Sequence, residues 1–178
     1  MHATTDSILH SNAQAFIVPM PQDGIVINPV LTRLLQSYPQ AFALYKQRAT
    51  KGELALGEVL TIKVQKQATG LMAGSKRLAD VLIFVITHHH HTHAIKVSAL
   101  ITACQTLNPE LFKLMRYDNL RYVAVSLGAE RDTQTADTLW QIVNTHLTVS
   151  RIRVEVHFNK AVDLSQFGKA GTTDDACQ

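Results

Sequence analysis

The chain has 178 residues, of which 46% are apolar and 17% charged, and its formal net charge is +3 at pH 7. This length suits one domain with a single sizeable core, and the small charge does not indicate nucleic acid as a partner. No apolar run reaches the roughly 20 residues of a membrane span, and the N-terminal residues lack the pattern of a secretion signal. Two distant cysteines, Cys104 and Cys177, form no disulfide framework, so we expect a cytoplasmic protein without a membrane partner.

The N-terminal quarter predicts one strand and one helix. The apolar run Ala15–Val18 predicts a strand, and prolines break the loop that follows. Asn28 then precedes Pro29, which is the combination of a good N-cap and a first-turn proline. We expect this helix to end before Pro39, because the residue before a proline avoids helical geometry.

The next segment predicts a helix, a glycine stop and two strands. A helix that starts at Pro39 is expected to end at Gly52. A β-branched run then predicts a strand over residues 57–65, and a basic connector with two glycines occupies residues 66–77. The continuous apolar run Val81–Ile86 is typical of a strand buried on both faces.

The second half continues the alternation of helices and strands. Helical spacing predicts a helix from Ala94 to Asn108 and a second helical segment from Glu110 to Met115. A strand over residues 122–127, a helix over residues 138–147 and a strand over residues 151–158 follow. The last strand alternates apolar and polar residues, which predicts one face in contact with water. The whole pattern predicts an α/β fold with a helix-covered sheet.

Residues 38–60 resemble bacterial macrodomains, in particular the antitoxin branch that removes ADP-ribose from DNA. The resemblance rests on a helix followed by a glycine-punctuated turn: Tyr38, Pro39, Phe42, Tyr45, Lys51, Gly52, Glu53, Leu54, Leu56, Gly57, Glu58 and Val59. Weaker matches extend it from residue 8 to about residue 158. It implies a macrodomain-like three-layer α/β/α domain with a central mixed sheet over residues 1–158. Composition predicts that residues 159–178 form a flexible tail.

The resemblance also implies where a ligand would bind. The family reads adenine with an acidic residue, whose place falls to Asp6 or to Ser7, one position later. Its first phosphate loop retains Gly24, while Asn28 occupies the place of the catalytic lysine. An amide supplies neither an ammonium group nor a general base, so we expect the family's hydrolysis to be absent.

The second phosphate loop of the family corresponds here to residues 127–133. Gly128 is retained, and Arg131 could hold a phosphate, as could the helix N-terminus at Asn28. Glu130 and Asp132 replace glycines and would repel a pyrophosphate. The sequence therefore predicts weak or undetectable affinity for ADP-ribose.

A histidine run follows the predicted buried strand. Thr87, which we count with the ligand-binding residues, opens the run, and it should lie at the carboxyl edge of the sheet, where such folds place ligands. If the strand continues, His88 and His90 face the same side and form a candidate metal-chelating pair, and His93 joins them if the chain turns. The alternative is a polar rim without a metal. His10 and His157 are interpreted as surface or strand-end residues, and Trp140 as a residue that packs in the core or at its boundary.

The leading interpretation is a degenerate, macrodomain-like binding module for ADP-ribose or a related nucleotide or anionic ligand, without hydrolysis and without a cofactor. One alternative is a ligand-free domain that binds a partner protein. Another is an ADP-ribosyl hydrolase that uses the cluster His88–His93.

Overall fold

The computed structural model describes residues 1–64, 79–127, 133–159 and 162–167. These residues contain a six-stranded sheet, in which every neighbouring pair is parallel except the pair at one edge, β3 with β4, which is antiparallel. In spatial order the strands are β1 (His2–Thr4), β6 (Arg153–His157), β5 (Tyr122–Ser126), β2 (Ala15–Pro21), β4 (Val81–His88) and β3 (Val59–Lys63).

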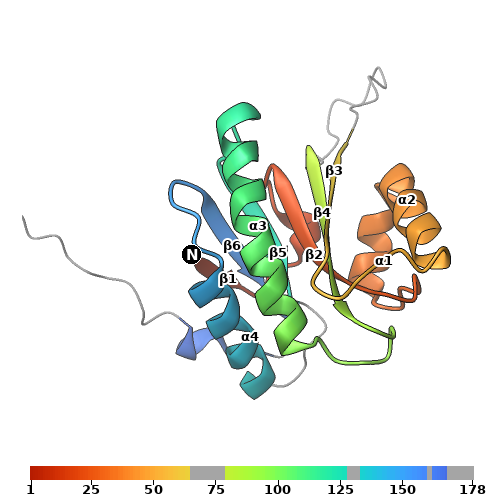
Figure 1. The fold of residues 1–178 in the computed structure, drawn as a ribbon. Helices are drawn as coiled ribbons and strands as arrows, with labels where there is room; N and C mark the ends of the chain where they lie inside the picture. Colours follow the sequence, from red (N-terminus) through yellow and green to blue (C-terminus); the bar gives the residue numbers. More distant parts are fainter. Residues whose placement is uncertain (65–78, 128–132, 160–161, 168–178) are drawn as a thin grey trace, which may run out of the picture.

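Two pairs of helices cover the two faces of the sheet (Figure 1). Helices α1 (Pro29–Gln36) and α2 (Pro39–Thr50) pack on one face. Helices α3 (Val97–Tyr117) and α4 (Thr133–His146) pack on the other. Two short 3-10 helices, η1 (Ile8–His10) and η2 (Leu164–Gln166), complete the described part. The predicted three-layer α/β/α architecture with a mixed sheet is confirmed.

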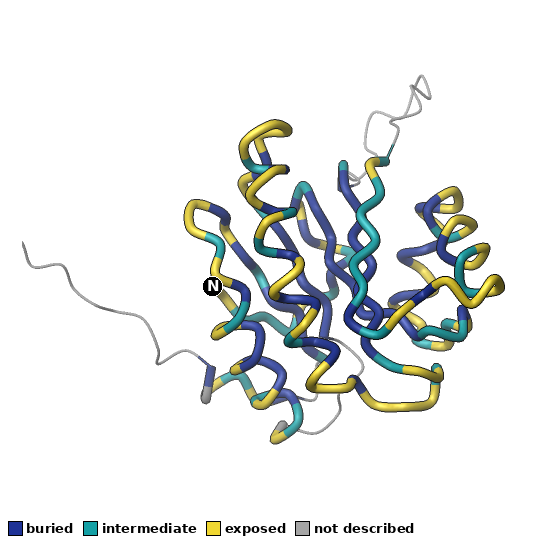
Figure 2. The backbone as a smooth tube through the Cα atoms, in the orientation of Figure 1, coloured by how far each residue is buried: buried dark blue, intermediate teal, exposed yellow. Residues whose placement is uncertain are grey.

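The central strands divide their side chains between two cores. In β2, Phe16 and Val18 contact the α1–α2 core, whereas Ile17 contacts the α3–α4 core. Every residue of β2 is buried, as are all residues of β4 except its last, His88. Figure 2 shows these strands as the buried centre of the molecule. The continuous apolar run in β4 is explained by this cover on both faces.

Helix α1 begins as the sequence predicts. The Oδ1 atom of Asn28 accepts hydrogen bonds from the backbone N–H groups of Val30, at 2.9 Å, and Leu31, at 3.2 Å. Pro29 occupies the first turn, and the helix ends at Gln36, ahead of Pro39. Asn28 is therefore the N-cap that fixes where the β2–α1 loop ends.

Helix α3 differs from the prediction of two segments separated at Asn108–Pro109. It is one helix of 21 residues with Pro109 inside it. Leu107 and Leu111, on either side of the proline, are both buried in the α3–α4 core. Burial of this continuous stripe outweighs the hydrogen bond that a proline removes.

Both ends of the described chain extend the packed region beyond the predicted elements. Strand β1 pairs with β6, although its three residues carry no apolar run. Past residue 158, Val162 and Phe167 are buried, and the Phe167 ring stacks on Phe158 with centroids 5.1 Å apart. The predicted role of Trp140 in the core is confirmed, since its ring meets that of Phe167 edge-on. Within the described ranges, no helix has the length and apolarity to cross a membrane.

Tyr45 of α2 anchors the end of β2. Its side chain is fully buried, and its hydroxyl donates a hydrogen bond to the backbone carbonyl of Pro21 at 2.5 Å. The ring also meets Phe84 of β4 edge-on at 5.5 Å. This bond fixes the point at which the chain leaves β2 for the loop of residues 22–28.

Candidate functional site

A cavity of about 270 Å³ opens at the carboxyl edge of the sheet. The ends of β1, β5 and β6 and the β2–α1 loop meet there, which is where open α/β sheets place their ligands. Its lining consists of Thr5, Asp6, Ser7, Ile8, Asn28, Val30, Ser126, His157, Phe158 and Asn159. The structure therefore brings together two of the residues singled out from the sequence, Asp6 and Asn28.

The side chains of Asp6 and its neighbour Ser7 differ in their hydrogen bonds. The Ser7 hydroxyl caps η1 by accepting a hydrogen bond from the Leu9 N–H. The Asp6 side chain is exposed at the cavity, and no side chain in the described ranges bonds its carboxylate. Asp6 is thus the carboxylate that can accept hydrogen bonds from a ligand in this cavity.

His157, the last residue of β6, connects the backbone of Asp6 to the sheet. Its side chain is buried, and its Nδ1–H donates to the backbone carbonyl of Asp6 at 2.8 Å. Sequence reasoning treated His157 as a surface or strand-end residue; it does end β6, but it is not on the surface. The predicted wet face of β6 holds at its start, where Arg153 is exposed and Glu155 half-buried, but not at His157, which lies under the segment that carries Asp6.

A small polar network continues from His157 along β6. The Nε2 atom of His157 lies 3.2 Å from a carboxylate oxygen of Glu155, which also accepts hydrogen bonds from the hydroxyls of Tyr122 and Ser11. Burial raises the pKa of Glu155, but the Tyr122 hydroxyl, the His157 charge and the Ser11 hydroxyl together bring that pKa below its ordinary value. Glu155 is therefore held as a carboxylate beside the cavity floor.

Asn28 lies at the cavity with its carbonyl oxygen already committed to helix α1. Because that oxygen binds the N–H groups of Val30 and Leu31, these two donors do not point freely toward an anion. The Thr32 N–H is likewise bonded, to the Asn28 backbone carbonyl. The expectation that the N-terminus of α1 could hold a phosphate is therefore not supported, and the Asn28 amide NH₂ remains the donor on this side.

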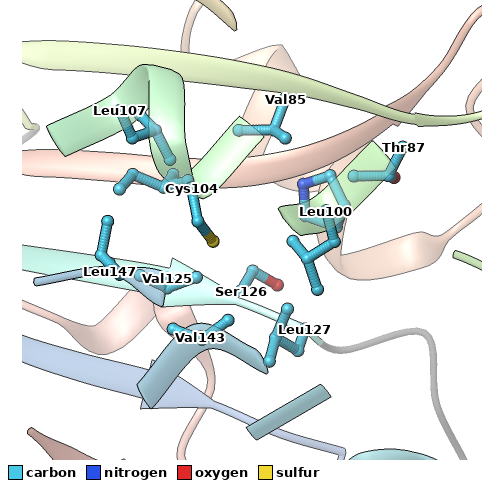
Figure 3. Close-up of a pocket in the computed structure, with 12 residues that line it drawn as sticks. Val85, Thr87, Leu100, Cys104, Leu107, Val125, Ser126, Leu127, Val143 and Leu147 are labelled. Carbon is cyan, nitrogen blue, oxygen red and sulfur yellow. The ribbon is translucent and has the colours of Figure 1, made fainter. Parts of the chain in front are cut away.

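Gly24 and Thr87 lie outside this cavity. Gly24 has a φ of +78° and packs against Ala49 of α2. Thr87 is fully buried; its hydroxyl contacts Nδ1 of His88 at 2.9 Å, and its side chain lines a separate small void of about 20 Å³. Figure 3 shows this void beside the Cys104 thiol and Ser126, a residue that borders both spaces. Gly128, Glu130, Arg131 and Asp132 fall outside the described residues.

The histidine run leaves the sheet instead of continuing β4. The strand ends at His88, so the predicted alternation that would pair His88 with His90 does not form. His88 is turned toward Thr87, and burial lowers its pKa. His91 instead contacts the carboxylate of Asp23, with Nδ1 and Oδ2 2.8 Å apart, and His90 Nε2 lies 3.6 Å from the same oxygen. The structure thus gathers Asp23, His90 and His91.

Sequence reasoning missed most of the cavity lining. Ser126, Phe158 and Asn159 were placed only as parts of predicted strands or of the tail. A signal was present, because all three follow or end parallel strands, and such positions converge at one edge. Ile8 and Val30 carried no signal beyond their apolar character.

No model of a protein family matches the sequence, and no curated protein sequence matches it at a significant level. Solved structures do match the fold. Thermosipho africanus DarTG in complex with ADP-ribose aligns with a TM-score of 0.72 at 14% identity, over 90% of this chain and 42% of that chain.

Two shorter structures align over most of their own length. The macrodomain of Mycobacterium tuberculosis DarG has a TM-score of 0.66 at 16% identity, over 88% of this chain and 95% of that chain. The Oceanobacillus iheyensis macrodomain with ADP has a TM-score of 0.58 at 10% identity, over 88% of this chain and 82% of that chain. Identities this low show the fold alone. With its sheet order, its helical layers and these alignments, the chain has the macrodomain fold, in a divergent form that is similar to the DarG macrodomains.

Proposed function

We propose that this protein binds ADP-ribose or a related adenine nucleotide in the cavity at the carboxyl edge, and that it does not hydrolyse it. The observation that carries the proposal is the cavity itself, about 270 Å³ in volume and bordered by Asp6, Asn28 and Phe158. Two solved structures that share the fold support the proposal: Thermosipho africanus DarTG is in complex with ADP-ribose, and the Oceanobacillus iheyensis macrodomain is a structure with ADP. The volume lies near the lower end of ligand pockets, about 300 Å³, and suits the adenosine part of such a ligand.

The residues of the cavity offer chemistry suited to a base and a ribose. The Asp6 carboxylate can accept hydrogen bonds from an exocyclic amine or a ribose hydroxyl. Val30, which lines the cavity and is 38% exposed, supplies apolar surface against which a flat ring can pack. His157 holds the Asp6 backbone at a fixed distance from β6, so the carboxylate is presented by a braced loop.

The same geometry supports binding without turnover. Asn28 stands where the resembled family has a catalytic lysine, and its carbonyl oxygen caps α1. Its amide has no proton to transfer near neutral pH. Because the cap also occupies the first N–H groups of α1, the phosphates of a ligand receive little stabilisation from this helix. We therefore propose a weak binding site that favours the nucleoside end.

Titration with adenosine, ADP and ADP-ribose tests this proposal. Followed by amide NMR shifts at millimolar ligand, all three ligands should perturb residues 6–8, 28 and 157–159. Incubation with ADP-ribosylated DNA or protein should release no ADP-ribose. Measurable release would overturn the non-hydrolytic assignment and favour the alternative in which His88–His93 act.

A matched pair of variants locates the ligand. Asn28→Asp keeps a capping oxygen, so thermal stability should be unchanged, but its negative charge should weaken ADP-ribose binding more than adenosine binding. Asn28→Ala removes the cap and should cost about 1 kcal/mol of folding stability. Equal affinity of Asn28→Asp and the unaltered protein for ADP-ribose would place the ligand elsewhere.

Failure of all three ligands to bind would favour the ligand-free interaction domain. One observation supports that second candidate. Ile25, Ile27 and Val30, on the β2–α1 loop and the start of α1, are large apolar side chains exposed to solvent by 47%, 61% and 38%. An apolar group of this kind beside a cavity is typical of a protein-binding surface.

A further inference from the structure

We infer that Asp23, His90 and His91 form a binding site for one divalent transition-metal ion of the Zn²⁺ class, which links the β2–α1 loop to the β4–α3 loop. The three side chains each offer one ligand atom, and these atoms all lie within 4.8 Å of one another. Asp23 follows β2, whereas both histidines follow β4, its neighbour in the sheet. The site is separate from the nucleotide cavity, whose lining contains none of the three residues.

The distances suit a tetrahedral ion. Zinc bonds to nitrogen and oxygen measure about 2.0–2.1 Å, so two ligand atoms of a tetrahedral site stand about 3.3–3.4 Å apart. The two measured separations from Asp23 Oδ2 are 2.8 Å to His91 Nδ1 and 3.6 Å to His90 Nε2, on either side of that value. All three ligand atoms lie within 4.8 Å of one another, so small rotations of the exposed His90 side chain and of its partners bring the three separations to the tetrahedral value.

The surroundings hold the ligands in place. The second oxygen of Asp23, Oδ1, accepts from the Ile25 N–H at 3.0 Å, and the His91 N–H donates to Oδ2 at 3.0 Å. His90 Nδ1 lies 2.9 Å from the hydroxyl of Thr92. The Thr92 backbone N–H also lies within hydrogen-bond distance of that Nδ1 atom, at 3.4 Å, so both polar groups of Thr92 orient the His90 ring, as outer hydrogen bonds orient metal-binding histidines.

Access and ligand type point to the class of metal. The side chains of Asp23 and His91 are each 18% exposed and that of His90 is 47% exposed, so an ion can enter from solvent. Two imidazoles with one carboxylate suit Zn²⁺, and also Ni²⁺ and Cu²⁺, better than Ca²⁺ or Mg²⁺. Water completes the shell, because the group of ligand atoms that lie within 4.8 Å of one another contains Asp23, His90 and His91 but not His93.

The test uses untagged, full-length protein stripped with a chelator. Titration with Co²⁺, whose visible absorption reports tetrahedral geometry, should show one equivalent bound, and Zn²⁺ should displace it. His91→Ala and Asp23→Asn should each weaken Zn²⁺ binding at least about tenfold. Mutation of residues that only hydrogen-bond to metal ligands already lowers metal affinity by about that factor. Melting temperatures without metal establish that each variant is folded.

Two neighbouring histidines provide matched controls. His89 contacts Gln22 and Lys96, and His88 contacts Thr87, so His89→Ala and His88→Ala should retain the affinity of the unaltered protein. If His91→Ala does not fold, His90→Ala replaces it, because that side chain is half exposed. The inference is overturned if no stoichiometric binding occurs. It is also overturned if His89→Ala weakens binding as much as His91→Ala, which would indicate a diffuse chelate along the histidine run.

Discussion

His157 donates a hydrogen bond from Nδ1 to the backbone carbonyl of Asp6 at 2.8 Å, across 151 positions of sequence. Its other ring nitrogen, Nε2, lies 3.2 Å from the Glu155 carboxylate, close enough for an ion pair but without the angle of a hydrogen bond. We infer an attraction between Nε2 and the carboxylate from their distance, because electrostatic attraction depends little on angle. The ring therefore joins the loop that carries Asp6 to strand β6 beneath it.

Replacing His157 by phenylalanine should destabilise the fold and weaken the nucleotide site together. The Asp6 carbonyl loses its donor and Glu155 loses the ring nitrogen beside its carboxylate, which should cost about 1–3 kcal/mol in free energy of unfolding. Urea denaturation measures the loss, and adenosine titration measures the affinity. His10→Ala, at an exposed position, is the control and should change neither. A stable His157→Phe protein with unchanged affinity would show that the Asp6 loop does not depend on this bond.

Glu155→Gln should lower stability in a pH-dependent way. Because the folded-state pKa of Glu155 is lowered from its ordinary value of 4.5, its carboxylate contributes stability above that pH. The contribution is lost as the pH falls through the folded-state value. The unfolding free energies of the two proteins should differ by about 1.5–3 kcal/mol at pH 6, as for hydrogen bonds to charged groups. The gap should shrink toward pH 3; a constant gap from pH 6 to pH 3 would exclude this explanation.

Gly24 and Gly52 form a natural pair for separating two costs of an added methyl group. Both have positive φ, +78° and +67°. A Cβ at Gly24 would lie 2.8 Å from Ala49 Cβ, whereas a Cβ at Gly52 would meet nothing within 4 Å. Gly52→Ala should thus carry only the backbone cost, about 1–2 kcal/mol, and Gly24→Ala about 1–3 kcal/mol more from overpacking. Equal melting temperatures would show that the β2–α1 loop moves away from α2 at no cost.

The sequence predicts the elements whose signals are local. Asn28 and Pro29 mark the start of α1, and the apolar run of β4 indicates burial on both faces; both predictions are confirmed. The failures involve contacts between distant parts of the chain. Pro109 stays inside α3 because leucines on both sides pack in one core, and β1 forms only because β6 is there to pair with it.

The candidate site shows the same division. Asp6 and Asn28 are singled out because they occupy the places of functional residues in the macrodomain pattern. Both line the same cavity. The pairing of Asp23 with His91 could not be predicted, because 68 positions separate them and the turn after His88 is not encoded by any glycine or proline. A histidine run gives no periodicity from which to tell a continuing strand from a turn.

The Cys104 thiol should be almost unreactive in the folded protein. It lies on α3 against the small void shown in Figure 3, and burial raises its pKa to about 11. At pH 8 only about a thousandth of such a thiol is ionised, and the thiolate is the reactive form. A Cys177→Ser variant leaves Cys104 as the single thiol of the chain. Its modification by a disulfide reagent should be slow in buffer and complete within seconds in denaturant; rapid modification in buffer would show that this face of α3 opens readily.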